Sequence, residues 1–153
     1  MTEILVIEDD DVMRLVVTRT LERYGYVVTA VRSGDEAMRC LEEDTGRFEL
    51  VVLDLMLGPV SGWDVLEAMN RDGLRDNTKV VVLSALQSEE HFVKGWTLGV
   101  DDYFTKPFDP DMFVLSVQEV LLSPKEELRR KRLEELQKAE LLHLVDSAFG
   151  EEA

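Results

Sequence analysis

Side chains able to handle a phosphate group follow several short apolar runs of this sequence. Carboxylates come after the first and third of these runs, and a hydroxyl and an amine come with the fourth and fifth: Glu8, Asp9, Asp54, Ser84 and Lys106. Clustered carboxylates repel one another unless a cation joins them, and a hard divalent ion such as Mg²⁺ prefers oxygen ligands of this kind. A lysine and a hydroxyl suit the oxygens of a phosphoryl group, and an aspartate is a suitable nucleophile for forming an acyl phosphate. We therefore expect one site that combines a magnesium ion with phosphoryl chemistry.

Each of these residues also has an ordinary structural explanation. Acidic residues after a strand are often helix N-caps, and we expect Asp10 or Asp11 to have that role. A single serine or lysine is usually structural or solvated. Placement of all these residues after four separate strands is much harder to obtain by chance, which favours a shared functional site.

The elements that must position these side chains alternate along the chain. Short β-branched or apolar runs are each followed by an amphipathic helical pattern. Two of the runs, residues 51–53 and 80–83, are apolar throughout, which is typical of strands buried on both faces of a parallel sheet. We therefore predict a doubly wound α/β domain over residues 1–122, with the carboxyl ends of the strands gathered at one edge of the sheet. The expected strands are 4–7, 26–31, 50–53, 79–83 and 102–105.

Residues 123–153 form a C-terminal extension in this interpretation. The Ser-Pro-Lys-Glu sequence at 123–126 is typical of a helix start with a capping box, and a helix of about 25 residues should follow. Two arrangements stay open: a helix folded back on its own domain, or an arm that pairs two copies. The preceding helix, 111–122, is apolar on two faces, so we expect both faces to be covered by other parts of the protein. The basic cluster 129–132 could meet acid-rich turns of a neighbouring copy, which favours a homodimer through both helices.

Composition narrows the classes of function. The 153 residues include 32 acidic and 17 basic side chains, and the formal net charge of −15 disfavours binding to nucleic acid or anionic lipid. No apolar run approaches the ~18–20 residues of a membrane-spanning helix, and the first residues lack the features of a signal peptide. A single cysteine, Cys40, suits a reducing cytoplasm, so we expect a cytoplasmic protein that does not bind membranes. The 31 residues after Leu122 also predict that no DNA-binding winged helix is appended.

Four segments together resemble the receiver domain of bacterial two-component response regulators: Ile4–Asp9, Val51–Gly62, Val80–Ala85 and Asp101–Phe108. The Asp-Asp-Tyr-Phe-Thr-Lys-Pro-Phe run is most similar to the OmpR-type subfamily. The resemblance implies a CheY-like, flavodoxin-like fold, with five parallel strands in the order 2-1-3-4-5. It also implies a phosphorelay partner, a sensor histidine kinase.

The resemblance assigns the phosphoryl chemistry to particular residues. It implies that Asp54 is the phosphoacceptor and that Mg²⁺ is bound by Asp9, by Asp54, by the Met56 carbonyl oxygen and, through water, by Glu8. In this family the residues two past the acceptor and two past the hydroxyl tune hydrolysis, and here they are Met56 and Leu86. Neither side chain is able to orient a water molecule, so we expect a long-lived acyl phosphate.

A conformational switch is the other implication of the resemblance. Lys106, joined to Pro107 by a cis bond, would pair with the phosphoryl group, and Ser84 would hydrogen-bond to one of its oxygens. Tyr103 would then move from an exposed to a buried position. Such a domain catalyses only its own phosphorylation and dephosphorylation, so we expect a signalling protein rather than an enzyme.

Two other functions are compatible with part of the pattern. Haloacid-dehalogenase-type phosphatases use a similar set of groups, but they need a second aspartate two residues after the nucleophile, where this chain has Met56. A binding module that works without phosphorylation is the other alternative. The chain also departs from the family pattern twice, since Gly58 precedes Pro59 and the helix at 111–122 has no basic residue for a salt-bridged dimer.

Overall fold

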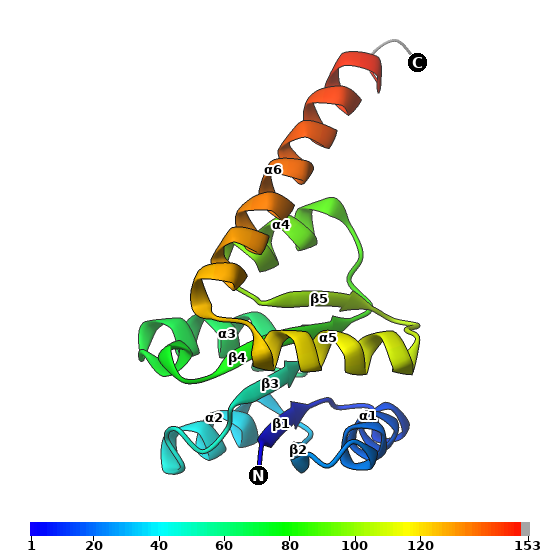
Figure 1. Ribbon diagram of the computed structural model, residues 1–153. Helices are drawn as coiled ribbons and strands as arrows, with labels where there is room; N and C mark the ends of the chain where they lie inside the picture. The colour runs from blue at the N-terminus through cyan, green and yellow to red at the C-terminus, as the bar shows by residue number, and fades with distance from the viewer. Residues whose placement is uncertain (151–153) are drawn as a thin grey trace.

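One five-stranded sheet forms the centre of the computed structural model, which describes residues 1–150. Its strands are β1 (Glu3–Ile7), β2 (Val27–Val31), β3 (Leu50–Leu53), β4 (Lys79–Ser84) and β5 (Asp102–Thr105). All neighbouring strands pair in parallel, in the order β2-β1-β3-β4-β5 (Figure 1). The predicted fold class and strand order are therefore confirmed, while the last three residues of the predicted extension lie outside the described part of the chain.

Helices cover both faces of this sheet. They are α1 (Asp11–Arg23), α2 (Gly34–Glu43), α3 (Gly62–Arg71), the 3-10 helix η1 (Leu74–Asp76), α4 (Glu89–Thr97), α5 (Pro110–Leu122) and α6 (Lys125–Gly150). Alternate residues of β1 point to opposite faces: Ile4 and Val6 pack with α1 and α5, and Leu5 and Ile7 pack with α2, α3 and α4. Both faces of β1 and β3 are buried, as the uninterrupted apolar runs predict for a covered parallel sheet. None of the described helices is long and apolar enough to cross a membrane.

Short polar side chains start most of the helices. The Asp10 carboxylate accepts from the backbone N–H groups of Val12 and Met13, so the predicted cap of α1 is confirmed. Ser123 is the residue expected to cap the N-terminus of α6. The hydrogen bond observed for its hydroxyl goes the other way along the chain, to the Glu119 carbonyl oxygen at the end of α5, at 2.6 Å. The Ser123 backbone N–H bonds to the same carbonyl at 2.9 Å, so both polar groups of Ser123 cap the C-terminus of α5.

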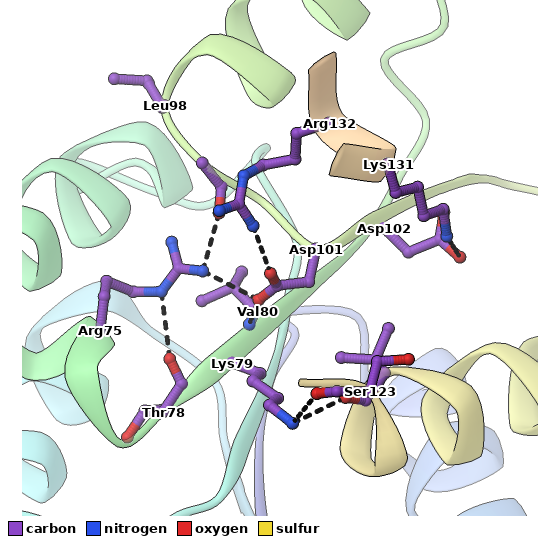
Figure 2. Close-up of polar contacts among 12 residues, drawn as sticks. Arg75, Thr78, Lys79, Val80, Leu98, Asp101, Asp102, Ser123, Lys131 and Arg132 are labelled. Carbon is purple, nitrogen blue, oxygen red and sulfur yellow. Dashed lines mark hydrogen bonds and ion pairs between the residues drawn. The ribbon is translucent and has the colours of Figure 1, made fainter. Parts of the chain in front are cut away.

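The first turns of α6 pack against their own domain. Leu128 is buried in the core cluster shared with α1 and α5, and the Lys131 ammonium pairs with Asp102 at 3.2 Å. Arg132 donates to the buried carboxylate of Asp101 at 2.7 Å (Figure 2). The helix then runs alongside α4 and extends past it (Figure 1). Part of the extension therefore folds back onto the domain.

This arrangement corrects the charge argument for the basic cluster 129–132. That cluster was expected to meet acid-rich turns of a neighbouring copy, but Lys131 and Arg132 bind carboxylates next to β5 of the same chain. The distal turns of α6 nevertheless carry exposed apolar side chains, with Leu141 and Leu144 63% and 60% exposed. Pairing of two copies through those turns stays a prediction.

Candidate functional site

The sheet brings the predicted site residues to one edge. Because β1 and β3 are in register from Ile4 to Ile7, the residues that follow these strands lie next to each other, and Asp54 donates its backbone N–H to the Ile7 carbonyl. Ser84 ends β4 on the other side of β3, and the Lys106 backbone N–H bonds to the Ser84 carbonyl. The parallel order therefore places these four strand ends at the same end of the sheet, as predicted.

Three carboxylates form the centre of the site. One oxygen each from Glu8, Asp9 and Asp54 lies within 4.8 Å of the others; Glu8 and Asp54 are buried, whereas Asp9 is exposed. The Oε2 atom of Glu8 is buried without a hydrogen-bond partner. A buried carboxylate oxygen without a partner is costly, and a hard divalent cation satisfies such an atom. The donor set therefore fits Mg²⁺.

Lys106 supplies the positive charge opposite these carboxylates. Its ammonium nitrogen donates to Glu8 Oε1 and, at 3.1 Å, to Asp54 Oδ2, and these hydrogen bonds raise the pKa of Lys106 although burial alone lowers it. Burial, together with the nearby Asp54, raises the pKa of Glu8 to about 8. The site is short of positive charge, since one ammonium group serves two buried carboxylates. The Lys106–Pro107 peptide bond is cis, as the resemblance implied.

The loop after Asp54 folds tightly over the site. Asp54 Oδ1 accepts from the Met56 backbone N–H at 3.0 Å, and Gly62 donates to the Leu55 carbonyl at 3.1 Å. A Cβ atom at Gly62 would lie 2.5 Å from the Leu55 Cα and still closer to the Asp54 carbonyl oxygen, so only glycine fits there. The close contact between Gly62 and Leu55 is therefore kept, although Gly58 and Pro59 stand in the reverse of the family's usual order.

Ser84 and Tyr103 lie beside the carboxylates. The Ser84 side chain is fully buried, and its oxygen accepts from the Leu86 N–H at 3.4 Å. Tyr103 is half-buried; its hydroxyl donates to the Leu86 carbonyl at 2.7 Å and its ring meets Phe92 edge-on, with centroids 4.8 Å apart. Burial, together with the Asp54 charge, raises the pKa of Tyr103 to about 12. The exposed starting position expected for Tyr103 is therefore not the one observed.

Sequence reasoning missed a second polar cluster, at the start of β5. Asp101 is buried and accepts from Arg75 at 2.9 Å, from Arg132 at 2.7 Å and from the Val80 N–H at 2.9 Å (Figure 2). Arg75 lies on η1, which the pattern of apolar residues did not predict. The sequence did contain one indication of this cluster. Asp101 and Asp102 are adjacent at the start of a strand, where carboxylates are able to bind the basic residues of a helix.

The chain matches one family model over most of its length. Residues 4–118 match the model of the response regulator receiver domain. The response regulator SaeR of Staphylococcus aureus is 34% identical over 121 residues, which cover 79% of this chain and 51% of SaeR. The chain therefore spans about half the length of the curated relatives it matches.

Solved structures of receiver domains share the fold. The Francisella response regulator 1452 receiver domain has a TM-score of 0.73 and 29% identity, covering 79% of this chain and 97% of that one. The BeF3-activated receiver domain of DrrB, an OmpR/PhoB homologue of Thermotoga maritima, has a TM-score of 0.71 and 32% identity, with coverages of 80% and 99%.

Proposed function

Because this chain belongs to the response regulator receiver domain family, we propose that it receives a phosphoryl group on Asp54 from a sensor histidine kinase. Receiver domains act in two-component signalling and are generally signalling proteins rather than classical enzymes. The observation that carries the proposal is the cluster in which Asp54 lies with Glu8 and Asp9 within 4.8 Å while Lys106 holds its Oδ2 oxygen. This arrangement supplies a nucleophile, a cation site and a counter-charge.

Magnesium fits the oxygen-rich side of the site. Asp9, Asp54 and the Met56 carbonyl oxygen would hold the ion, with Glu8 supporting it through water. A bound Mg²⁺ neutralises charge on the carboxylates and on the phosphoryl oxygens during transfer. The unpartnered Oε2 of Glu8 supports this assignment, because a bound ion and its waters would offer that atom a partner.

The chain's own residues position the reacting groups. A carboxylate oxygen of Asp54 attacks phosphorus in line, forming the acyl-phosphate O–P bond while the P–N bond to the kinase histidine breaks. Oδ1 is held by the Met56 N–H at 3.0 Å, which leaves Oδ2 as the oxygen that Lys106 releases for attack. The Lys106 ammonium then pairs with an oxygen of the transferred group.

Ser84 and Tyr103 would convert phosphorylation into a change of shape. The Ser84 hydroxyl has only a long bond to Leu86, at 3.4 Å, so it is free to turn toward a phosphoryl oxygen. Because Tyr103 donates to the carbonyl of that same Leu86, movement of the 84–86 segment alters the support of the tyrosine ring. This shared contact couples the site to α4 and to the α6 turns that lie over it.

Homodimerisation through α5 and α6 is the output that the exposed apolar surface favours. Leu115 and Leu122 of α5 are 51% and 85% exposed, and the distal turns of α6 expose Leu141 and Leu144. A helix that is apolar on two faces is stable when both faces are covered. The alternative output is a protein partner on the same surface.

Beryllofluoride, a stable mimic of the phosphoryl group, tests the proposed acceptor. We expect ¹⁹F NMR to show bound fluoride signals that require both Mg²⁺ and beryllofluoride, and we expect Asp54→Asn to abolish them. Asp44→Asn, an exposed carboxylate at the end of α2, is the matched control and should bind normally. Bound signals that persist in Asp54→Asn would remove Asp54 from the mechanism. Turnover of a generic phosphomonoester would instead revive the phosphatase alternative.

A further inference from the structure

A second charged cavity lies at the amino ends of the strands, the opposite end of the sheet from Asp54. It has a volume of about 440 Å³ and lies where the N-terminal end of β4 meets the beginning of α6. Its walls come from the end of α3, from η1 and the following turn, and from the first two turns of α6. Nothing in the proposed phosphorylation chemistry uses this cavity.

Positive charge dominates the walls of the cavity, although the whole chain has a net charge of −15. Five of its lining residues are cations, namely Arg75, Lys79, Lys125, Arg129 and Arg132. The carboxylates in the same lining are Asp76 and Asp101. Such a concentration of cations in an acidic protein indicates an anion site, because a local potential of one sign attracts ligands of the other.

The carboxylates in the cavity do not balance these cations. Asp101 is buried and already shared between Arg75 and Arg132, at 2.9 and 2.7 Å (Figure 2). Burial lowers the pKa of Arg75, and the nearby charge of Arg132 lowers it too, against the opposing effect of Asp101. Each arginine binds a different oxygen of Asp101, so two positive charges share one negative charge, and a further anion would stabilise the pair.

Lys79 adds a positive charge that is held without a carboxylate. Its ammonium group donates to the carbonyl oxygens of Val120, Leu121 and Ser123, at 2.8, 3.1 and 3.0 Å (Figure 2). These bonds fix the charge beside the junction of α5 and α6, and no carboxylate within residues 1–150 pairs with it. Fixed charges of this kind favour anion binding because no side chain has to be ordered first.

The beginning of α6 supplies the mobile ligands. Lys125 and Arg129 are exposed at the cavity, and neither forms an ion pair with any side chain in the described part of the chain. Among the residues that the structure describes, no side chain accepts from the first N–H groups of α6, which an α-helix leaves without an internal partner. A helix N-terminus adds to the attraction for a phosphate group that the cations already provide.

We propose that this cavity binds a small phosphorylated molecule, with Lys125, Arg129 and the free guanidinium nitrogens of Arg132 on its phosphate oxygens. The volume exceeds that of a single phosphate ion and falls in the usual range for sites that hold small molecules. Asn70, Asn77 and Thr78 line the rest of the cavity and offer hydrogen bonds to the polar body of such a ligand. The ligand class is therefore a diphosphate or phosphate ester of about nucleotide size.

Calorimetric titration of the full-length Asp54→Asn chain with pyrophosphate and with ADP, in EDTA, tests this site. The asparagine and the absence of magnesium keep the proposed phosphorylation site silent, so failure here and failure of the proposed function are distinguishable. We expect saturable binding of both probes and none of adenosine, which has the same body as ADP without phosphate. If neither pyrophosphate nor ADP binds saturably up to millimolar concentration, the proposal is overturned.

Two neighbouring arginines provide a matched pair of variants. Arg129→Gln removes a lining cation and should weaken ADP binding by about tenfold or more, the effect of one charge-assisted hydrogen bond. Arg130→Gln removes the same charge from an exposed position outside the lining and should leave the affinity within about twofold. Equal affinities in the two variants, or adenosine binding as tightly as ADP, would show that the cavity does not recognise phosphate. Thermal unfolding of each variant without ligand confirms that it is folded.

Discussion

A single lysine joins the two buried carboxylates at the site. Lys106 bonds to Glu8 and to Asp54 in this structure, so its ammonium group already lies next to the carboxylate that is proposed to carry the phosphoryl group. In the proposed mechanism, phosphoryl transfer would give Lys106 a phosphoryl oxygen as its partner in place of the Asp54 carboxylate oxygen. The proposed activation would therefore be an exchange of partners at Lys106, which would require little movement of the lysine.

We expect the lifetime of the proposed acyl phosphate to depend on Met56. Its side chain is 53% exposed and carries no group able to orient an attacking water, so we expect slow hydrolysis. Met56→Asn introduces an amide beside the phosphoryl group and should accelerate dephosphorylation by about tenfold. Met112→Asn on α5, where the methionine is 56% exposed, should not change the rate. Loss of the phosphoryl group followed by intact mass distinguishes the two; a wild-type half-life of seconds would contradict this expectation.

Tyr103 should ionise at unusually high pH. Burial is the main cause that raises its pKa to about 12, so the neutral phenol is the form that the folded chain stabilises. That contribution to stability is complete below the ordinary tyrosine pKa of about 10 and is lost as the pH rises from about 10 to about 12. The phenolate absorbance of wild type minus that of Tyr103→Phe should stay near zero until the pH exceeds about 11. A difference step centred near pH 10 would show that the ring is freely solvated.

At the scale of elements, Gly62 controls how α3 approaches the phosphoacceptor. A Cβ atom at this position would collide with the Asp54 carbonyl oxygen and the Leu55 Cα, so Gly62→Ala should lower the free energy of unfolding by about 2 kcal/mol or more. Displacement of the loop should also weaken Mg²⁺ binding. Gly58→Ala in the same loop is the control, because its Cβ would meet nothing within 4 Å. Chemical denaturation measures both, and equal stabilities would mean that the loop adjusts freely.

The strands and the carboxyl-end cluster were predictable because they depend on local patterns. Uninterrupted apolar runs such as Val80–Leu83 identify buried parallel strands, and the topology of parallel sheets then places Asp54 and Lys106 at one edge. The position of Tyr103 was not predictable, since it depends on the Leu86 carbonyl, which is 17 residues away. Docking of α6 depends in the same way on a buried carboxylate, Asp101, whose surroundings no local pattern describes.

On the scale of the whole molecule, two charged sites lie at opposite ends of the strands of one sheet. Carboxylates gather after the carboxyl ends of the strands, and cations gather at the other end beside α6. β4 and β5 run between the two ends, because Lys79 and Asp101 lie near one site while Ser84 and Lys106 lie at the other. β5, which carries the proposed switch residue Tyr103, therefore also anchors the C-terminal helix through Asp102.

Association of two copies is the whole-molecule outcome expected of the exposed α6 surface. Light scattering should give the mass of two copies at physiological ionic strength, where salt screens the repulsion between chains of charge −15. Replacing Leu141 and Leu144 by glutamate should produce the mass of one copy, because both side chains are exposed on the distal turns. Val12→Glu on α1, where the valine is 71% exposed, should leave the mass unchanged. A single-copy mass for wild type, with and without beryllofluoride, would rule out the arm.

Intact-mass spectrometry after incubation with acetyl phosphate and Mg²⁺ tests the central claim most directly. The account predicts that the wild-type chain gains ~80 Da, the mass of one phosphoryl group, and that Asp54→Asn gains nothing. Removal of magnesium with EDTA should prevent the gain as well. A wild-type chain whose mass does not change, or an Asp54→Asn chain that gains the same mass, would contradict the account.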